Sequence, residues 1–249
     1  MASEVFSDSS GIILNTNLSY NLSEEFTIIE EIPSSGYNCL VKVMRYGKFF
    51  VLKGLKEQYA QNSLYQGLLK KEFDILLQLN HPNIVRCYSL EQINNFGLCI
   101  VMDFIDGKTL NNFLKTNPKM NVRLRIVKQL LEAMQYYHPM QIVHRDIKPS
   151  NILITDNGHN VKIIDFGLAD TDYYAVFKEP AYTKYYASPE QLEGGKLDCR
   201  SDIYSFGRVL QQICSSSYPP HRHLPKFRKI IKRCTQNKRE NRYQKAESV

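Results

Sequence analysis

One short stretch near the middle of this 249-residue chain constrains its fold more than any other feature. Two polar runs, His-Arg-Asp-Ile-Lys-Pro-Ser-Asn at 144–151 and Asp-Phe-Gly at 165–167, enclose two short apolar segments at 152–155 and 161–164. An Asp-Asn-Gly turn separates the two apolar segments, and this pattern predicts a β-hairpin. The hairpin would bring the end of the first polar run and the start of the second to the same place in the fold.

The two polar runs resemble the catalytic motifs of the eukaryotic-like Ser/Thr protein kinase family. A lone Asp-Phe-Gly is a common turn and a lone His-Arg-Asp is usually a solvated loop, so it is their order and spacing that favour the kinase interpretation. The resemblance implies that Asp146 accepts or orients the proton of the attacking hydroxyl and that Lys148 neutralises charge on the transferring phosphoryl group. Asn151 and Asp165 would hold Mg²⁺, or Mn²⁺, against the phosphates of ATP.

The resemblance also implies an α+β fold with two lobes. We expect residues 1–25 to form an extension that is partly disordered or packs on the N-lobe. The kinase domain would then cover 26–249, and the length and the 43% hydrophobic fraction suit a chain that buries a sizeable core. It would comprise a small antiparallel β-rich N-lobe at 26–102 and a hinge at 103–107. The C-lobe at 108–249 would be mostly helical and abbreviated at its C-terminus.

Alternating apolar segments predict three antiparallel N-lobe strands, at 26–29, 40–43 and 49–53. An apolar-periodic helix follows and ends before Pro82. The resemblance implies that Lys53, at the end of the third strand, pairs with Glu72 on this helix and grips the α and β phosphates. Without the catalytic motifs, the same two residues would be an ordinary strand lysine and a helix charge.

The segment that resembles the phosphate-covering loop departs from the family pattern of three glycines. Gly36 and Val41 keep the pattern, whereas Ser34 and Cys39 stand where the other two glycines are expected. Glycine lets backbone N–H groups approach phosphate, so we expect weaker ATP binding here. Val51 stands where the family has the alanine that packs on adenine, and its extra bulk should narrow the pocket.

A buried strand at 98–102 leads into the segment that resembles the hinge between the lobes. Met102 would be the gatekeeper behind adenine, and the peptide groups from Asp103 to Ile105 would bind the adenine edge. Thr109 either reaches the ribose or caps a helix at its N-terminus, and the sequence leaves both readings open.

The C-terminal half predicts helices at 111–114 and 123–138 and contains an Ala-Ser-Pro-Glu run that resembles the anchor of a kinase activation segment. The resemblance implies that Glu190 pairs with Arg242 and that Asp202 holds the catalytic loop. These anchors favour a protein substrate, and Lys148 with Thr183 favours serine or threonine as its acceptor.

Two further residues concern regulation. In the family, the arginine at the position of Arg145 commonly binds a phosphate on the activation segment, and Glu179 stands at the matching position here. A fixed carboxylate could partly replace that phosphate, or Glu179 could be an ordinary loop charge.

The six cysteines are scattered without zinc spacing, which favours a reduced, cytoplasmic setting. We expect neither a signal peptide nor a membrane-spanning segment, because residues 1–21 carry no basic region and no long apolar run. Much of the net charge of +7 lies between Arg222 and Lys245, where apolar residues recur at helical spacing. This pattern favours a solvated helix face, then docking to a partner, and nucleic acid least.

Two rival functions remain. A pseudokinase that binds nucleotide or acts as a scaffold would explain the degraded glycine loop. Against it stand the five intact residues most directly tied to catalysis, which are Lys53, Glu72, Asp146, Asn151 and Asp165. A small-molecule phosphotransferase would leave the activation-segment anchors without a purpose.

Overall fold

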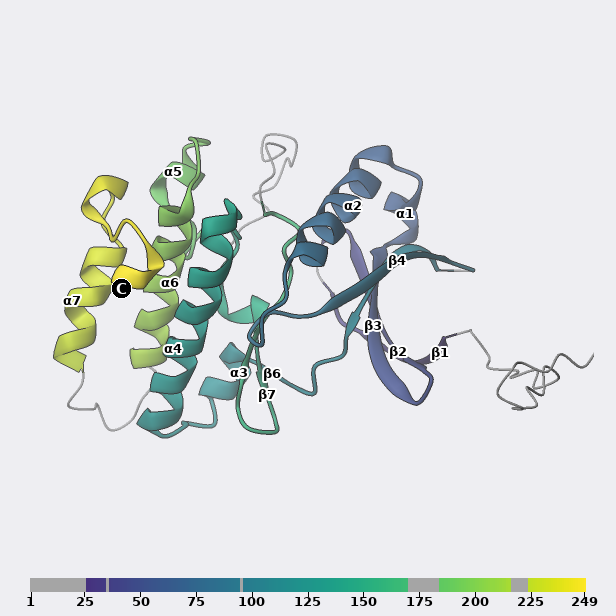
Figure 1. Ribbon diagram of the computed structural model, residues 1–249, viewed down its shortest axis with the longest axis horizontal. Coiled ribbons are helices and arrows are strands. Elements are labelled where there is room, and N and C mark those ends of the chain that lie inside the picture. The colour runs from purple at the N-terminus through teal and green to yellow at the C-terminus, as the bar shows by residue number, and fades with distance from the viewer. Residues whose placement is uncertain (1–25, 35, 95, 170–183, 216–223) are drawn as a thin grey trace, which may run out of the picture.

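The computed structural model describes residues 26–34, 36–94, 96–169, 184–215 and 224–249. These residues form two lobes, a β-rich N-lobe on the right of Figure 1 and a helical C-lobe on the left. The predicted α+β, two-lobed arrangement is thus confirmed. The N-terminal extension lies outside the described residues.

The N-lobe is built on a five-stranded antiparallel sheet whose strand order is β1-β2-β3-β5-β4. Its strands are β1 (Thr27–Ile32), β2 (Asn38–Arg45), β3 (Lys48–Leu55), β4 (Cys87–Ile93) and β5 (Gly97–Asp103). Strand β4 was not among the strands predicted from the sequence. Its sequence, Cys-Tyr-Ser-Leu-Glu-Gln-Ile, lacks apolar alternation, and only its first residue is buried.

The alternation of side chains along β3 and β5 divides the N-lobe core between the two faces of the sheet. Leu52 on β3 and Val101 on β5 belong to a small apolar cluster on the outer face. Leu55 and Ile100 belong to the main core, which continues into the C-lobe. Lys53 lies directly opposite Ile100, so the strand period directs its long side chain towards the inner face.

Two helices accompany this sheet, α1 (Glu57–Ala60) and α2 (Ser63–Gln78). The side chain of Asn62 caps α2 by accepting the backbone N–H of Leu64 at 2.9 Å. The apolar face of α2 packs into the core, and Glu72 is buried on the same face.

The C-lobe combines a small sheet, in the order β6-β7-β8, with helices and short 3₁₀ turns. The strands are β6 (Gly107–Thr109), β7 (Ile152–Thr155) and β8 (Val161–Ile163), of which the last two form the predicted hairpin. The helices are α3 (Leu110–Leu114), α4 (Met120–Tyr137), α5 (Pro189–Leu192), α6 (Cys199–Ser215) and α7 (Leu224–Cys234). The 3₁₀ turns are η1 (His138–Met140), η2 (Pro149–Asn151), η4 (Arg239–Asn241) and η5 (Ala246–Ser248).

Helix α4 begins three residues earlier than the predicted start at Arg123. Arg123 is a charged residue that is only 1% exposed, because its guanidinium donates to the carbonyl groups of Pro118 and Ile213. The predicted start was late because the N-cap residue of α4, Lys119, makes no side-chain cap hydrogen bond, so the sequence carries no start signal there. Within the part of the chain that the structure describes, no helix has the length and hydrophobicity needed to cross a membrane.

Candidate active site

Lys53 lies at the centre of a three-residue ion-pair network between the lobes. Its Nζ is 2.6 Å from Oε1 of Glu72 on α2 and 2.8 Å from Oδ1 of Asp165, which follows β8. Its side chain is only 5% exposed, and although burial lowers its pKa, the two carboxylates outweigh this and raise it overall. The ammonium group is therefore held permanently charged at this point.

The residues after Asp165 keep α2 close to the site. Phe166 is fully buried and packs on His144, with 4.5 Å between ring centroids. A Cβ atom at Gly167 would meet Oε2 of Glu72 at 3.2 Å, so a side chain there would push this carboxylate away. Glycine thus fits this position without any shift of the Lys53–Glu72 pair.

A second network surrounds Asp146 on the loop that follows η1. Oδ2 of Asp146 is 2.7 Å from Nζ of Lys148 and accepts a hydrogen bond of 2.8 Å from Nδ2 of Asn151. The same amide nitrogen also donates to the Asp146 carbonyl oxygen at 3.0 Å. The Asp146 carboxylate is therefore fixed in position by two donors, one of them charged.

The two carboxylates of the site differ in their titration. Burial raises the pKa of Asp146 to about 6, although Lys148 and Asn151 act in the opposite direction. For Asp165, burial also favours the neutral acid, but the Lys53 ammonium outweighs it and lowers the pKa to about 2. One carboxyl thus exchanges its proton near neutral pH, while the other stays ionised.

The donor set of Asn151 and Asp165 suits a hard cation such as Mg²⁺. Both amide protons of Asn151 are donated to Asp146, which fixes Oδ1 as the atom that can bind a metal. The Asp165 side chain is 41% exposed, so an oxygen can reach a ligand while the carboxylate is paired with Lys53. Among the described residues no cluster of three or more His, Cys, Asp or Glu side chains occurs, and Mg²⁺ commonly completes its coordination with waters and phosphate oxygens.

Asp202 of α6 fixes the backbone of the catalytic loop from below. It is fully buried, and its carboxylate accepts the backbone N–H groups of His144 and Arg145 at 2.8 and 2.9 Å. The hydroxyl of Tyr137 also donates to this carboxylate, at 3.1 Å. Nε2 of His138 lies 3.2 Å from the same carboxylate oxygen. Arg145 has φ = 66°, a region unfavourable for a residue with a side chain, and the Asp202 bond helps to hold it there.

Arg242, which is buried, and Glu190, which is partly buried, form a bidentate ion pair between α5 and the C-terminal turns. Both nitrogen–oxygen distances are 2.7 Å, and the guanidinium also donates to three backbone carbonyls. Burial raises the pKa of Glu190, but the hydrogen bonds from Arg242 outweigh it and lower the pKa to about 2. The neighbouring Gln191 donates to the Arg145 carbonyl at 2.7 Å, so this anchor is connected to the catalytic loop.

The loop between β1 and β2 carries the residues expected to cover phosphate. Gly36 has φ = 74°, which a side chain would make unfavourable. Ser34 Oγ donates to the Asn38 carbonyl at 2.7 Å, and Nζ of Lys56 donates to the Gly36 carbonyl at 2.7 Å. The ring of Tyr37 packs on Tyr65 of α2, with centroids 4.9 Å apart.

The predicted hinge, 103–107, runs from the last residue of β5 to the first residue of β6. Met102 is buried and lies opposite Val51 on β3, while Val41 lies opposite Leu52 in the outer cluster. The Asp103 side chain binds Nζ of Lys48 at 2.9 Å. Ile105 is partly buried against the main core.

Thr109 caps α3, accepting the Asn112 N–H at 3.4 Å, as the capping alternative expected. Thr183 and Glu179 lie outside the described residues. Sequence reasoning missed Lys56, Tyr37 and Gln191, which contact the site through backbone carbonyls or ring packing, and neither kind of contact leaves a sequence motif.

The sequence pattern of the protein kinase domain family matches residues 26–249. The chain belongs to this family. A probable serine/threonine-protein kinase of Clostridium acetobutylicum is 32% identical over 259 aligned positions, which include 92% of this chain and 39% of that protein. PrkC of Bacillus subtilis, a serine/threonine-protein kinase, is 35% identical over 173 positions, 68% of this chain and 26% of its own length.

PknB of Mycolicibacterium smegmatis, also a serine/threonine-protein kinase, is 33% identical over 212 positions, 80% of this chain and 34% of its own length. This chain therefore spans only about a quarter to two fifths of the length of these relatives. The predicted resemblance to the Ser/Thr kinase family is confirmed at the level of the family.

Proposed function

We propose that this chain is a protein kinase that transfers the γ-phosphate of ATP to serine or threonine hydroxyls of protein substrates, itself included. The observation that carries the proposal is Lys53, which binds Glu72 and Asp165 at the same time. This arrangement joins the N-lobe helix to the metal-binding end of the C-lobe hairpin, and it positions one fixed positive charge for the phosphates.

The reaction then depends on positioning and charge. Asp146 accepts the proton of the incoming hydroxyl, and Lys148, 2.7 Å away, offsets the negative charge of the phosphoryl group as it moves. Asn151 and Asp165 would hold Mg²⁺, for which Mn²⁺ can substitute, and the ion would neutralise charge on the phosphate oxygens.

The nucleotide would lie between Gly36 and Val51 of the N-lobe and the backbone from Asp103 to Ile105. The adenine-facing role predicted for Val41 is wrong, because Val41 packs with Leu52 in the outer cluster on the other face of the sheet. Met102 would close the pocket behind adenine. The Thr109 hydroxyl would bind the ribose through hydrogen bonds that it can still make while it caps α3. Arg145 would respond to the activation segment, where Thr183 contributes to substrate binding and Glu179 supplies a fixed negative charge.

The proposed partners are ATP and a protein substrate, without nucleic acid or membrane. The protein-substrate assignment is supported by the Glu190–Arg242 and Asp202 anchors, which hold the segment that binds a peptide. A cytoplasmic location is supported by the six cysteines, all of which are free thiols.

The test is transfer of labelled γ-phosphate from Mg-ATP to the chain and to a generic basic protein. Asp146→Asn and Asp165→Asn should abolish incorporation while the protein stays folded, and Asp156→Asn is the matched control. Asp156 is an exposed aspartate at the hairpin turn, and its carboxylate lies 3.5 Å from the ammonium group of exposed Lys108. Equal incorporation by all four proteins would overturn the assignment.

The degraded glycine loop supports the rival pseudokinase reading, so the same experiment includes thermal denaturation with ATP. Absence of incorporation combined with a stabilising shift would indicate a nucleotide-binding module. Absence of both would indicate a scaffold.

A further inference from the structure

Three tyrosines of the N-lobe form a continuous aromatic cluster next to the proposed active site. The ring of Tyr37, in the loop between β1 and β2, has its centroid 4.9 Å from that of Tyr65 on α2. The centroid of the Tyr65 ring in turn lies 4.6 Å from that of Tyr59 on α1. All three side chains are partly buried against the main core, so the cluster packs a loop and two helices together.

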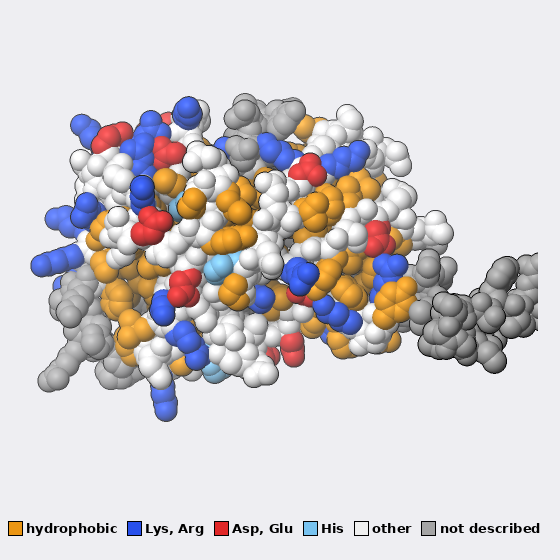
Figure 2. All heavy atoms as spheres, in the orientation of Figure 1, with side chains coloured by type: hydrophobic (Ala, Val, Ile, Leu, Met, Phe, Trp, Pro, Cys, Tyr) orange, Lys and Arg blue, Asp and Glu red, His pale blue; other side chains and the backbone are white. Residues whose placement is uncertain are grey.

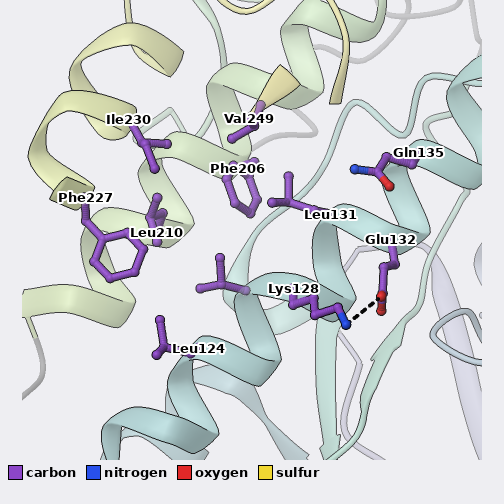
Figure 3. Close-up of a pocket in the computed structure, with 11 residues that line it drawn as sticks. Leu124, Lys128, Leu131, Glu132, Gln135, Phe206, Leu210, Phe227, Ile230 and Val249 are labelled. Atoms are coloured by element: carbon purple, nitrogen blue, oxygen red, sulfur yellow. Dashed lines mark ion pairs between the residues drawn. The ribbon is translucent and has the colours of Figure 1, made fainter. Parts of the chain in front are cut away.

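Apolar side chains gather in the C-lobe as well, as the orange patches on the left of Figure 2 show. In the groove of Figure 3, Phe227 and Ile230 of α7 face Phe206 and Leu210 of α6 and pack on the main core. None of the described residues that line this groove belongs to the proposed active site. The tyrosine cluster differs in this respect, because one of its members lies in the loop expected to cover the phosphates.

Lys56, the residue that follows β3, holds the same loop from its other side. Its backbone N–H donates to the Tyr37 carbonyl at 2.9 Å, and its Nζ donates to the Gly36 carbonyl at 2.7 Å. The loop is therefore fixed to the end of β3 by hydrogen bonds and to α2 by a ring contact. Serine and cysteine stand at two positions where glycine was expected, so contacts of this kind replace the close fit that glycines would give.

Helix α2 connects this ring contact to the catalytic lysine. Tyr65 and Glu72 are seven residues apart, which places them on the same face of the helix, about 10 Å apart along its axis. Burial raises the pKa of Tyr37 to about 12, and the charges of Lys53, Glu72 and Asp165 act on the same phenol. The Tyr37 ring is thus a neutral group that lies close to the ion-pair network.

We propose that Tyr37 is a positioning residue for ATP, because its contact with Tyr65 holds the phosphate-covering loop closed against α2. This role rests on the proposed function, in which the phosphates lie between the loop and Lys53. A loop that is already fixed in its closed position loses less conformational entropy when a ligand binds. The Tyr37–Tyr65 contact therefore offsets part of the ATP affinity that is lost with the missing glycines.

The first test separates KM for ATP from kcat. Tyr37→Ala should raise this KM about 3- to 10-fold, the scale of one aromatic pair, and leave kcat within about twofold, because no group that touches the reacting atoms has changed. Tyr37→Phe keeps the ring and should restore the original KM. Tyr46→Ala, at a tyrosine of the β2–β3 turn that is 60% exposed, is the matched control and should change neither constant.

Two results would overturn the proposal. An unchanged KM in Tyr37→Ala would show that the ring does not position the loop. A lowered KM would show that the ring obstructs the nucleotide.

A double-mutant cycle locates the effect at the ring contact. Tyr65→Ala should raise KM by a factor similar to that of Tyr37→Ala, since it removes the partner and leaves the loop sequence intact. The double variant should raise KM little further, because both changes remove the same contact. Effects that multiply in the double variant would contradict the proposal, since each tyrosine would then act independently.

The ring contact can also be measured without nucleotide. The chain contains no tryptophan, so Tyr37→Trp introduces a single fluorescent reporter at the loop. Its emission should lie at shorter wavelength than that of Tyr46→Trp, and adding Tyr65→Ala should shift it to longer wavelength as the loop is released to solvent. Emission that Tyr65→Ala leaves unchanged would overturn the proposal whether or not phosphate is transferred. If the unchanged chain transfers no phosphate, the proposed function fails, and the dissociation constant of ATP replaces KM in the same comparison.

Discussion

At the scale of single residues, the titration of Asp146 should set the acidic limit of activity. Burial raises its pKa to about 6, and only the carboxylate can accept a proton. We therefore expect kcat/KM to fall as pH decreases through about 6, approaching tenfold per pH unit below it. Initial rates of peptide phosphorylation from about pH 5 to about pH 8 would measure this, and a flat profile across that range would contradict it.

Lys148 should influence both the rate and the position of that limit. Its ammonium group lies 2.7 Å from Asp146 and lowers the pKa of that carboxyl. In Lys148→Ala the pKa of Asp146 should rise, so the acidic limb moves to higher pH. The optimal kcat should fall about 10²- to 10³-fold, the scale seen when one stabilising donor is removed.

Lys148→Arg is the matched control for this change. It keeps a cation beside Asp146, so its pH profile should stay near that of the unchanged protein even if its rate falls. An Ala variant with an unshifted acidic limb would show that another group controls the proton.

At the scale of elements, the Glu190–Arg242 pair joins α5 to the C-terminal turns. Arg242 is 1% exposed, and Arg242→Ala would leave Glu190 and three backbone carbonyls without this donor. Removing one partner of a buried pair costs about 3–5 kcal/mol, which lowers Tm by about 2–4 °C per kcal/mol in a chain of this size. Arg239→Ala, at a partly exposed arginine, should cost less than about 1 kcal/mol.

The pH dependence of this loss has a definite sign. Burial raises the pKa of Glu190, but hydrogen bonds from Arg242, the backbone and Ser201 together lower it from 4.5 to about 2. The pair therefore stabilises the fold above about pH 4.5 and is lost as pH falls towards 2. The Tm difference between Arg242→Ala and the unchanged protein should therefore shrink between about pH 5 and pH 3. A difference that stays constant over this interval would show that packing, not charge, is responsible.

In the loop between β1 and β2, the structure reveals a role for Ser34 that the sequence did not predict. The sequence predicts that serine in place of glycine weakens ATP binding, whereas the structure gives Ser34 a hydrogen bond across the turn, to the Asn38 carbonyl. A bond of this kind contributes about 0.5–1.5 kcal/mol. We expect Ser34→Ala to raise KM for ATP by roughly 2- to 10-fold with kcat nearly unchanged, as measured by steady-state kinetics. An unchanged KM would mean that the loop needs no such bond.

Much of the fold could be predicted from the sequence, because its elements leave local signals. The hairpin at 152–163 has apolar strands and a turn, and α2 has apolar periodicity and ends before Pro82. Strand β4 could not be predicted, because most of its residues are only partly buried and its pattern is therefore mixed. The first turn of α4 was missed because its N-cap residue, Lys119, makes no side-chain cap hydrogen bond and so gives no start signal.

In the candidate site, too, some residues could be predicted from the sequence and others could not. Residues within the two polar runs could be located from spacing, and the structure brings Lys53, Glu72 and Asp165 together from three separate elements. Lys56 and Tyr37 could not be found, because their contacts are with a backbone carbonyl and a neighbouring ring. Such contacts depend on the path of the chain and not on residue type.

At the scale of the whole molecule, the lobes are joined by the hinge and by the loop that follows α2. In that loop Asn83 is buried, and its side chain donates to the Val161 carbonyl at 3.0 Å. Its own carbonyl accepts the Ile163 N–H at 2.8 Å, and Val85 donates to the Ile163 carbonyl at 2.9 Å. The helix that carries Glu72 is thus fastened to the strand that ends just before Asp165.

This connection should couple stability to catalysis. Asn83→Ala leaves the buried Val161 carbonyl without its donor, at a cost of about 1–3 kcal/mol. Because α2 is then less firmly fixed relative to Asp165, the Lys53–Glu72 pair should form in a smaller fraction of molecules, and kcat/KM should fall along with Tm.

Asn112→Ala, at an exposed asparagine of α3, is the matched control and should change neither quantity. The decisive measurement compares kcat/KM with Tm at a temperature well below unfolding. A lowered Tm with undiminished kcat/KM would show that the bond stabilises the C-lobe alone and that α2 is positioned by its own packing in the N-lobe. A fall in both would mean that one buried asparagine transmits the position of the C-lobe hairpin to the N-lobe lysine.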